Sequence, residues 1–261
     1  MQYSVIDFHT HPFIETKDNI CIHKECFPMD INNTRTMMQS LGVEHICGSV
    51  ISTLPLQKGE SIWDRLQENN RTALQLKEKY QDFYSVGFHI HPDYKQQSLD
   101  EIEKMSALGV KILGELVPYI HAYSGYTHKH FDEIIECATA KNLIVSLHSM
   151  GEDEMDILVK RHPNTTFVMA HPGEYKFFCR HLARAKLSEN YYVDVSGTGM
   201  FRHGMLRHLI DGIGVEHVLF GSDYPVCNVA MNIGGVTLDT LLTEHEKQQI
   251  LYGNAKRLLQ L

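Results

Sequence analysis

The sequence has no hydrophobic run long enough to cross a membrane. No window approaches the roughly 20 uninterrupted apolar residues that a membrane-spanning helix needs. The first residues, MQYSVIDFHTH, also lack the basic start, apolar stretch and small-residue cleavage site of a secretion signal. These absences predict a protein that stays in the cytoplasm and has no membrane partner.

Paired cysteines and clustered positive charge are missing as well. Six cysteines are scattered through 261 residues without a CxxC motif, which predicts free thiols rather than a disulfide framework or a thiolate metal site. The 24 Lys and Arg residues form no basic stripe, and the net charge is −8. Because nucleic-acid phosphates are bound by clustered Lys and Arg, we expect no nucleic-acid partner. The expected partners are a small-molecule substrate and a second copy of the chain in a homodimer.

Histidine is the residue that the sequence has in excess. There are 17 histidines among the 261 residues. The neutral imidazole ring is the commonest protein ligand for borderline metal ions. The composition therefore gives a first indication of metal binding.

Short apolar runs alternate with stretches of helical character, which is typical of parallel strands joined by helices. The runs are SVIDFHTH, HICGSVIS, YSVGFHI, VKILGEL, LIVSLHS, TFVMAH, YYVDVSG and HVLFGSD. Eight such strands close a barrel. A hydrophobic content of 43% suits one large buried core. The sequence therefore predicts a single domain over residues 1–261, an α/β protein with a (β/α)8 TIM-barrel fold.

The segments between the runs carry helix signals. One apolar stripe of helical period is formed by Phe131, Ile134, Ile135 and Ala138. Ser98 and Glu101 have the spacing of a capping box, which predicts a helix start at residue 98. The tail, GNAKRLLQL, predicts a final helix. Residues 12–33, which contain Pro12, Pro28, Asn32 and Asn33, are interpreted as a loop beside the active site.

Polar residues gather at the ends of the predicted strands. In a parallel barrel, the C-terminal ends of all strands meet at one rim, so residues far apart in sequence converge there. This rule selects His9, His11, Glu115, His148, His171 and Asp223. Four imidazoles and two carboxylates at one mouth need a shared partner, and a divalent cation supplies it.

The six residues suit the activation of water by a metal. His9 and His11 lie two residues apart on one strand, so both point to the same side, while Phe8 and Thr10 would face the helices. A bound metal ion lowers the pKa of a water molecule to about 7. Asp223 is the candidate to take the proton of that water and pass it to the leaving group.

Glu115 bears on the number of metal ions. If its carboxylate bridges, the site holds two metals. If it only accepts a hydrogen bond from a ligand, one metal is enough. The residues alone leave both arrangements open.

Other histidines are weaker candidates. His89 and His91 repeat the HxHP pattern at the end of the third run, but they would duplicate ligands that the first run provides. His128 and His130 are expected at the surface, at a helix start. Two further histidines either line the pocket or are exposed, and these are His121 and His23.

The residues at the strand ends, in this order, resemble the metal-dependent amidohydrolase superfamily, and within it the amidohydrolase-related branch of TIM-barrel proteins. The resemblance extends over DFHTHP, LIVSLHS, FVMAHPG, HVLFGSDYP and GNAKRLL. It implies that His9, His11 and Asp223 hold a divalent metal, zinc first and Mn²⁺ as the alternative. His148 would be a further ligand of that ion or of a second.

Two groups within the superfamily imply different metal counts. In proteins that resemble aminocarboxymuconate-semialdehyde decarboxylase there is one metal, and the histidine matching His171 works as an acid/base. In proteins that resemble the TatD nucleases, a glutamate matching Glu115 bridges two metals, and the residues matching His148 and His171 bind the second. One or two ions per chain therefore stay open, and we favour two.

Three functions follow as hypotheses. The first is a metal-dependent hydrolase of a small molecule, with a metal-activated water and Asp223 as the proton shuttle. The alternative is a non-oxidative decarboxylase or hydratase of an unsaturated carboxylic acid, with His171 as the acid/base and Arg202 as a candidate clamp for the anionic substrate. The third is a non-catalytic metal-binding protein, which would leave no open position on the metal for water.

Overall fold

The computed structural model describes residues 3–15, 20–21, 30–173, 175–197 and 202–261 of the chain. Eight parallel strands form one sheet in the order β1 to β8. Their bounds are β1 Val5–Thr10, β2 Val43–Ser49, β3 Tyr84–Phe88, β4 Ile112–Leu116, β5 Ile144–His148, β6 Thr166–Ala170, β7 Tyr191–Asp194 and β8 Val218–Leu219. Each of the eight predicted runs overlaps one of these strands.

Backbone contacts between β1 and the segment around β8 bring the two edges of the sheet together. The Phe8 amide donates to the Phe220 carbonyl at 2.9 Å, and the Asp223 amide donates to the His9 carbonyl at 2.8 Å. A parallel bridge between Thr10 and Tyr224 extends this contact. The predicted TIM barrel is confirmed.

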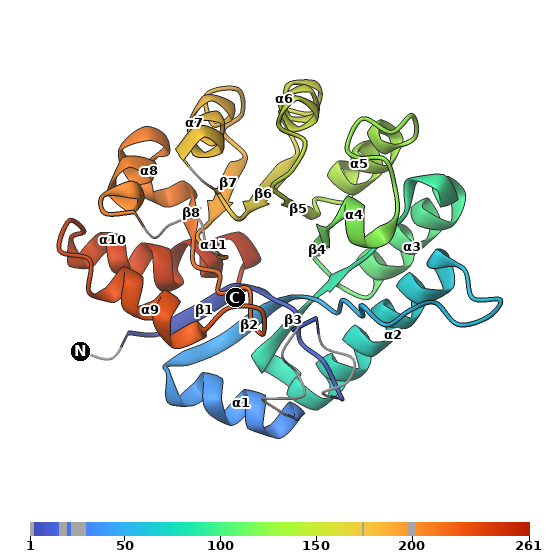
Figure 1. Ribbon diagram of the computed structural model, residues 1–261, viewed down its shortest axis with the longest axis horizontal. Coiled ribbons are helices and arrows are strands. Elements are labelled where there is room, and N and C mark those ends of the chain that lie inside the picture. Colours follow the sequence, from blue (N-terminus) through green and yellow to red (C-terminus); the bar gives the residue numbers. More distant parts are fainter. Residues whose placement is uncertain (1–2, 16–19, 22–29, 174, 198–201) are drawn as a thin grey trace.

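Helices surround the strands as an outer ring (Figure 1). The α-helices are α1 Ile31–Ser40, α2 Ile62–Tyr80, α3 Lys95–Ala107, α4 Pro118–His121, α5 Phe131–Ala140, α6 Glu152–Arg161, α7 Tyr175–Arg184, α8 Met205–Ile213, α9 Val229–Thr237, α10 Glu244–Gln248 and α11 Asn254–Leu259. Short 3₁₀ turns lie at η2 Gln81–Phe83, η3 Pro92–Tyr94 and η4 Val215–His217, and η5 Gln249–Gly253 is a π-helical segment. None of the helices in the described ranges is long and apolar enough to cross a membrane.

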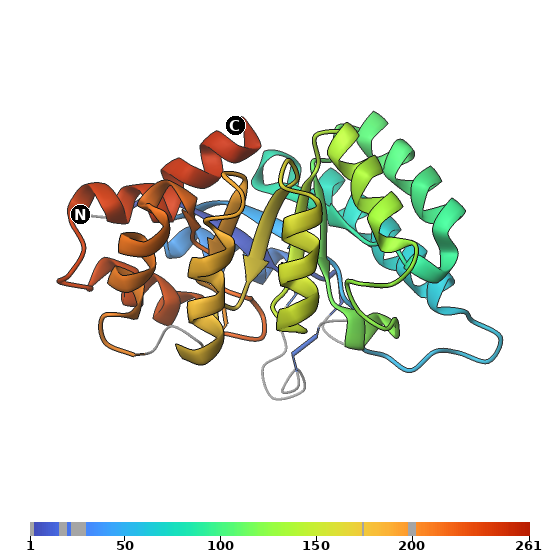
Figure 2. The ribbon, with the colours of Figure 1, turned by 90° about the horizontal axis from the view of Figure 1, so that it is seen from above.

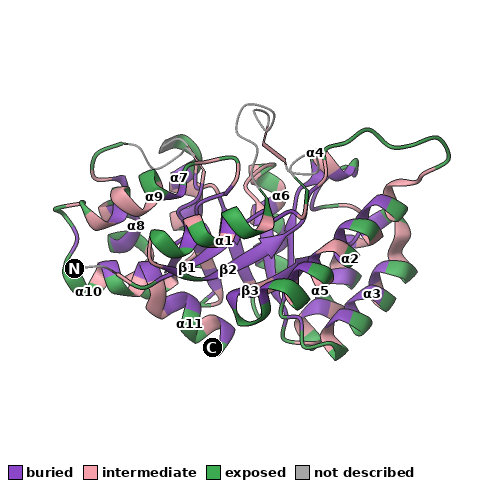
Figure 3. Ribbon diagram, turned by 90° about the horizontal axis from the view of Figure 1, so that it is seen from below, coloured by how far each residue is buried: buried purple, intermediate pink, exposed green. Residues whose placement is uncertain are grey.

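The buried core has two parts. The larger part packs the outer side of the strands against the helices, and it includes the predicted stripe on α5. The smaller part joins residues of six strands with Ala255 and Leu259 of α11, so it lies inside the barrel. Helix α11 and helix α4 lie at opposite ends of the barrel (Figures 2 and 3). Because α4 follows the C-terminal end of β4, α11 covers the N-terminal end and leaves the rim with the predicted site open.

Strand β1 contains a bulge that changes the direction of its side chains. Asp7 pairs with Ile46 and Thr10 pairs with Gly48, so β1 advances three residues where β2 advances two. Such an extra residue re-aims the side chains that follow it. Ile6 and Phe8 both belong to the cluster inside the barrel, so alternation holds up to Phe8 and the residues after it are re-aimed. The expectation that Phe8 faces the helices was wrong, because strict alternation does not hold through a bulge.

Strand β4 contains a second bulge, at Gly114 and Glu115. Leu113 pairs with Val145 and Leu116 pairs with Leu147, again three residues against two. Gly114 has φ +107°, and a Cβ atom there would lie 2.2 Å from the Ser146 carbonyl oxygen. Only glycine fits at this position, and the bulge places the Glu115 carboxylate on the inner side at the rim.

Two local predictions need correction. Helix α3 begins at Lys95, and the Ser98 hydroxyl donates to the His91 carbonyl at 2.8 Å instead of capping a helix. The predicted loop 12–33 ends before Ile31, where α1 begins behind the capping side chain of Asp30. Much of that loop, including His23, lies outside the described residues.

Candidate metal centre

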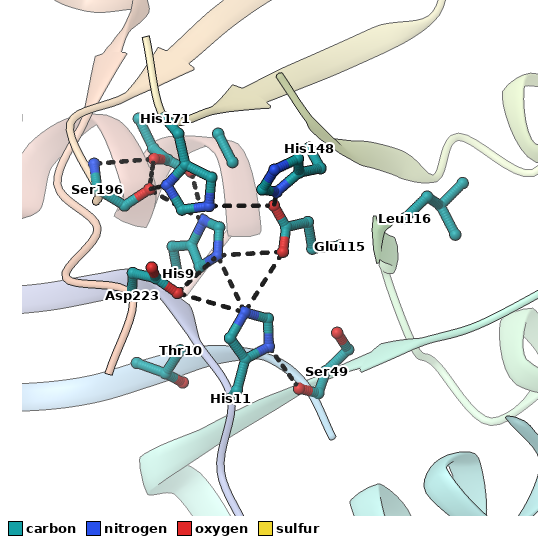
Figure 4. Close-up of polar contacts among 12 residues, drawn as sticks. His9, Thr10, His11, Ser49, Glu115, Leu116, His148, His171, Ser196 and Asp223 are labelled. Carbon is teal, nitrogen blue, oxygen red and sulfur yellow. Dashed lines mark hydrogen bonds and ion pairs between the residues drawn. The ribbon is translucent and has the colours of Figure 1, made fainter. Parts of the chain in front are cut away.

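The six residues selected at the strand ends lie together at the C-terminal rim of the barrel (Figure 4). His9 and His11 come from β1 and the residue after it, Glu115 from β4, and His148 from the end of β5. His171 and Asp223 follow β6 and β8. His9, His11, Glu115 and Asp223 are buried, whereas His148 and His171 are half-buried on the open side.

Four ligand-type atoms surround one small space. The Nε2 atoms of His9 and His11 are 3.3 Å apart. Glu115 Oε2 lies 3.5 Å from the His9 nitrogen and 3.3 Å from the His11 nitrogen. Asp223 Oδ1 lies 3.7 Å and 3.5 Å from the same two nitrogens.

The separations among His9, His11 and Asp223 fit three neighbouring ligands of one metal ion. When ligand atoms lie about 2.1 Å from a tetrahedral ion, neighbouring ligand atoms are about 3.4 Å apart. The five measured separations scatter around this value. Two imidazole nitrogens with carboxylate oxygens are a donor set that zinc and its neighbours accept. The cluster therefore fits a divalent metal.

The second oxygen of Glu115 faces the other two histidines. Glu115 Oε1 lies 3.4 Å from His171 Nε2, a separation that suits two ligands of one ion. It lies 2.9 Å from His148 Nδ1, which is the length of a direct hydrogen bond. Within the described residues, the groups that could hold an ion are His9 with His11 and Asp223, and His9 with Glu115 and His171. His148 is in neither group.

The far side of each first-strand imidazole is held by a hydrogen-bond acceptor. His9 Nδ1 lies 2.9 Å from Asp194 Oδ2, and His11 Nδ1 lies 3.0 Å from the Ser49 carbonyl oxygen. Because a carbonyl or ionised carboxylate only accepts, both rings carry a proton on Nδ1. The lone pair of a neutral ring is then on Nε2, which points at the metal position.

Ser196 extends the same arrangement to His171. Its hydroxyl makes a short hydrogen bond to Asp194 Oδ1 and lies 3.0 Å from His171 Nδ1. Because the Ser196 hydroxyl donates its hydrogen bond to the Asp194 carboxylate, its oxygen is left to accept a hydrogen bond from Nδ1–H of His171. His171 therefore also offers its Nε2 lone pair toward Glu115.

The charges of the site are strongly coupled. Burial disfavours the ionised form of Glu115, but the facing imidazoles overcome it and hold the pKa of this carboxyl well below its usual range. Burial likewise lowers the pKa of His11, but Asp223 and Glu115 raise it to about 9. Asp194 and Glu115 raise the pKa of His9 well above its ordinary value against the same effect of burial. The carboxylates thus favour positive charge at the centre, which protons or a metal cation supply in competition.

The backbone at two of the rim residues is unusual. His171 has φ +56° and Asp223 has φ +64°, a region that residues other than glycine seldom adopt. Such conformations concentrate at functional sites, where the surrounding structure holds them in place. Gly197 packs directly beside His171, because a Cβ at residue 197 would lie 2.5 Å from His171 Nδ1.

Asp194 and Ser196 are site residues that the sequence analysis missed. Both lie at the end of the seventh run, YYVDVSG, so the strand-end rule could have selected them. Arg202, the candidate clamp, is exposed and lines a cavity of about 390 Å³ together with Gly197 and Asn232. His128 and His130 are half-buried, and they contact Asp93 Oδ1 and the Pro92 carbonyl rather than the site.

The parallel barrel with its His and carboxylate cluster at the C-terminal rim has the architecture of a barrel enzyme with a metal centre. The chain belongs to the amidohydrolase family, whose sequence model matches residues 6–261. The resemblance drawn from the strand ends is thereby confirmed. Among curated proteins, none matches the chain.

Several solved structures share the fold. A 2,6-dihydroxybenzoate decarboxylase from Rhizobium has a TM-score of 0.76 at 15% identity, over 99% of this chain and 99% of that one. A dihydroxybenzoic acid decarboxylase from Polaromonas sp. JS666, solved with bound manganese and the inhibitor 2-nitroresorcinol, has a TM-score of 0.70 at 16% identity, over 99% and 97%. A probable 2-pyrone-4,6-dicarboxylic acid hydrolase from Acinetobacter baumannii, solved with citric acid, has a TM-score of 0.67 at 15% identity, over 100% of both chains. At these identities the likeness shows a common fold.

Proposed function

We propose that this protein is a metal-dependent hydrolase of a small molecule. The observation that carries the proposal is the inward-facing group of His9, His11 and Asp223, whose donor atoms are spaced as ligands of one ion, with Glu115 Oε2 close to both imidazole nitrogens. A divalent cation at this position would polarise a substrate oxygen and lower the pKa of a water molecule. Zinc is the first candidate and Mn²⁺ the second, and His171 with Glu115 Oε1 offers a weaker position for a second ion.

Asp223 is the residue placed to move the proton of the attacking water. Its Oδ1 atom faces the His9 and His11 nitrogens, and its side chain is at the mouth of the barrel. A carboxylate beside the reacting water accepts a proton during attack and returns it to the leaving group. The orientation of His9 and His11 is kept by Asp194 and Ser49 while this happens.

A second candidate is non-oxidative decarboxylation, with His171 as the acid/base. His171 is half-buried on the open side, its Nδ1 is fixed by Ser196, and its Nε2 faces the centre. This places one titratable nitrogen where a substrate carbon could receive a proton. Two of the structures with the same fold are named as decarboxylases of dihydroxybenzoates, which supports testing this class of substrate.

The experiment offers both substrate classes to the metal-loaded protein. Lactones, esters and amides are followed by product chromatography, and hydroxylated aromatic acids are followed by carbon dioxide release. We expect hydrolysis, and we expect Asp223→Asn to lower kcat by at least about 100-fold, the usual share of a general acid/base. A matched Asp100→Asn change at an exposed position on α3 is the control.

Three results would count against the proposal. Unchanged turnover in His9→Ala would remove the metal centre from the reaction. Carbon dioxide release without hydrolysis, lost in His171→Gln, would replace the first candidate by the second. No turnover of either class would contradict both.

A further inference from the structure

A second group of buried polar side chains lies beside the metal centre. His89 follows β3, Ser49 ends β2, and His121 ends α4 after β4. All three are at most 2% exposed. His89 belongs to the HIHP motif that repeats the pattern of the first strand, and the proposed reaction does not use it.

Several polar atoms of this group have no partner among the described residues. They are Nδ1 of His89, both ring nitrogens of His121 and the hydroxyl oxygen of Ser49. The Tyr123 hydroxyl is also buried without a partner among these residues. A buried polar atom without a partner costs about 1–3 kcal/mol. So many at one place indicate a position built to receive a polar group from outside the chain.

The group is coupled to the metal centre through two consecutive carbonyls at the end of β2. The Ser49 carbonyl accepts from His11 Nδ1 at 3.0 Å, and the Val50 carbonyl accepts from His89 Nε2 at 2.8 Å. His11 and His89 therefore bond to neighbouring residues at the end of β2. The ring of His121 packs edge-on against that of His89, with 4.5 Å between the ring centroids.

The hydrogen-bond chemistry of the two rings is defined. Burial lowers the pKa of His89 to about 4, and burial followed by the neighbouring His89 lowers that of His121 well below its usual range. Both rings are therefore neutral. Because His89 donates from Nε2, its Nδ1 is an acceptor and needs a donor. A neutral His121 offers one donor and one acceptor.

We propose that His89 and His121 form a subsite that binds a hydroxyl group of the substrate next to the metal centre. A hydroxyl both donates and accepts, which matches the bare nitrogen of His89 and the N–H of His121, whereas a carboxylate or an ether gives His89 no proton. The proposal rests on the proposed function in that the hydroxyl is part of the molecule that reaches the metal. A water molecule has the same donor and acceptor pattern and is the rival occupant.

The test uses the full-length, metal-loaded protein labelled with ¹⁵N in its histidine rings. Two-bond ¹H–¹⁵N spectra report the protonation of each ring nitrogen during titration with phenol, and separately with anisole, its methyl ether. We expect phenol to shift the His89 and His121 nitrogens saturably and at least tenfold more tightly than anisole does. His45 is an internal control, because it is buried and both of its ring nitrogens already have partners, the Asp82 carbonyl and Ser85 Oγ.

The variant His121→Leu should abolish the effect of phenol on His89. No shift with either probe, equal shifts with both, or an unchanged phenol response in His121→Leu would mean that the group holds only water or has another structural role. A cationic His89 ring at neutral pH would also overturn the proposal. Metal content, measured on the same samples, reports on the proposed function separately, so loss of metal with an intact phenol response would contradict the function and not the subsite.

Discussion

At the scale of single residues, Asp194 determines which ring nitrogen of His9 faces the proposed metal position. It lies at the end of β7, fully buried, and binds both His9 Nδ1 and the Ser196 hydroxyl. Burial raises the pKa of Asp194, but the charge of His9 outweighs this and keeps the pKa below its usual value. An ionised Asp194 thus orients His9 directly and His171 through Ser196.

The substitution Asp194→Asn removes this charge and keeps the size of the side chain. We expect zinc affinity to fall by about 10–100-fold, as is usual when the carboxylate behind a metal-binding histidine is lost. Competition with a chromophoric chelator measures the change. Asp100→Asn is the surface control, and an unchanged affinity in Asp194→Asn would show that the orientation of His9 does not depend on Asp194.

The sequence predicted the six polar residues at the rim and missed the residues behind them. His9, His11 and Asp223 stand out because their residue types and strand-end positions suit a metal. Asp194 is also a carboxylate at a strand end, but its importance comes from its contacts with His9 and Ser196. His9 is distant in the sequence, and the inward direction of Ser196 is visible only in the folded chain. Similarly, the unpartnered nitrogens of His89 and His121 cannot be seen from spacing.

At the scale of elements, the two bulges explain how the strands aim their polar residues. The eight strands were predictable because apolar runs separated by helical stretches have a clear period. The bulges at residues 7–10 and 113–116 break the alternation of that period. A prediction from alternation assumes that each residue of a strand pairs with one residue of the neighbouring strand. It therefore places Phe8 wrongly, and it does not explain why Glu115 faces inward.

The substitution Gly114→Ala tests the bulge in β4. The added methyl would meet the Ser146 carbonyl oxygen at 2.2 Å and hold an L-residue at φ +107°, so we expect a loss of unfolding free energy on the order of 3 kcal/mol. Metal content should fall with it, because Glu115 is displaced. Urea unfolding and metal analysis are the measurements.

Gly59→Ala separates the effect of backbone strain from that of the clash. Gly59 has φ +87° and no atom within 4 Å of an added Cβ, so we expect a loss of only about 1 kcal/mol. A Gly114→Ala protein as stable as Gly59→Ala would mean that the bulge is not closely packed.

At the scale of the whole molecule, the unfolding free energy at low pH depends on histidines that are buried in the folded chain as neutral rings. His181 on α7 is fully buried and contacts the Tyr191 hydroxyl of β7 at 2.7 Å. Burial, followed by the positive charge of Arg184, lowers the pKa of His181 to about 3. Above pH 6.5 the ring is neutral in both the folded and unfolded chain, and below this pH only the unfolded chain binds a proton.

The unfolding free energy should therefore fall as the pH drops from about 6.5 toward 3, by about 1.4 kcal/mol per pH unit for this residue. Between pH 7 and pH 5, wild type should lose about 2 kcal/mol more than His181→Gln does. Urea unfolding at both pH values checks this, with the exposed His245→Gln as the control. Equal losses in wild type and His181→Gln would show that His181 is not held neutral in the folded chain.

The barrel as a whole brings donor atoms from three strand ends, those of β1, β4 and β8, to the proposed metal position. The zinc retained per chain after dialysis against a weak chelator measures whether these donor atoms bind an ion. We expect about one tightly held ion in wild type, and none in His9→Ala or His11→Ala proteins that remain folded. Wild-type protein that retains no metal, or a His9→Ala protein that retains as much as wild type, would contradict this expectation.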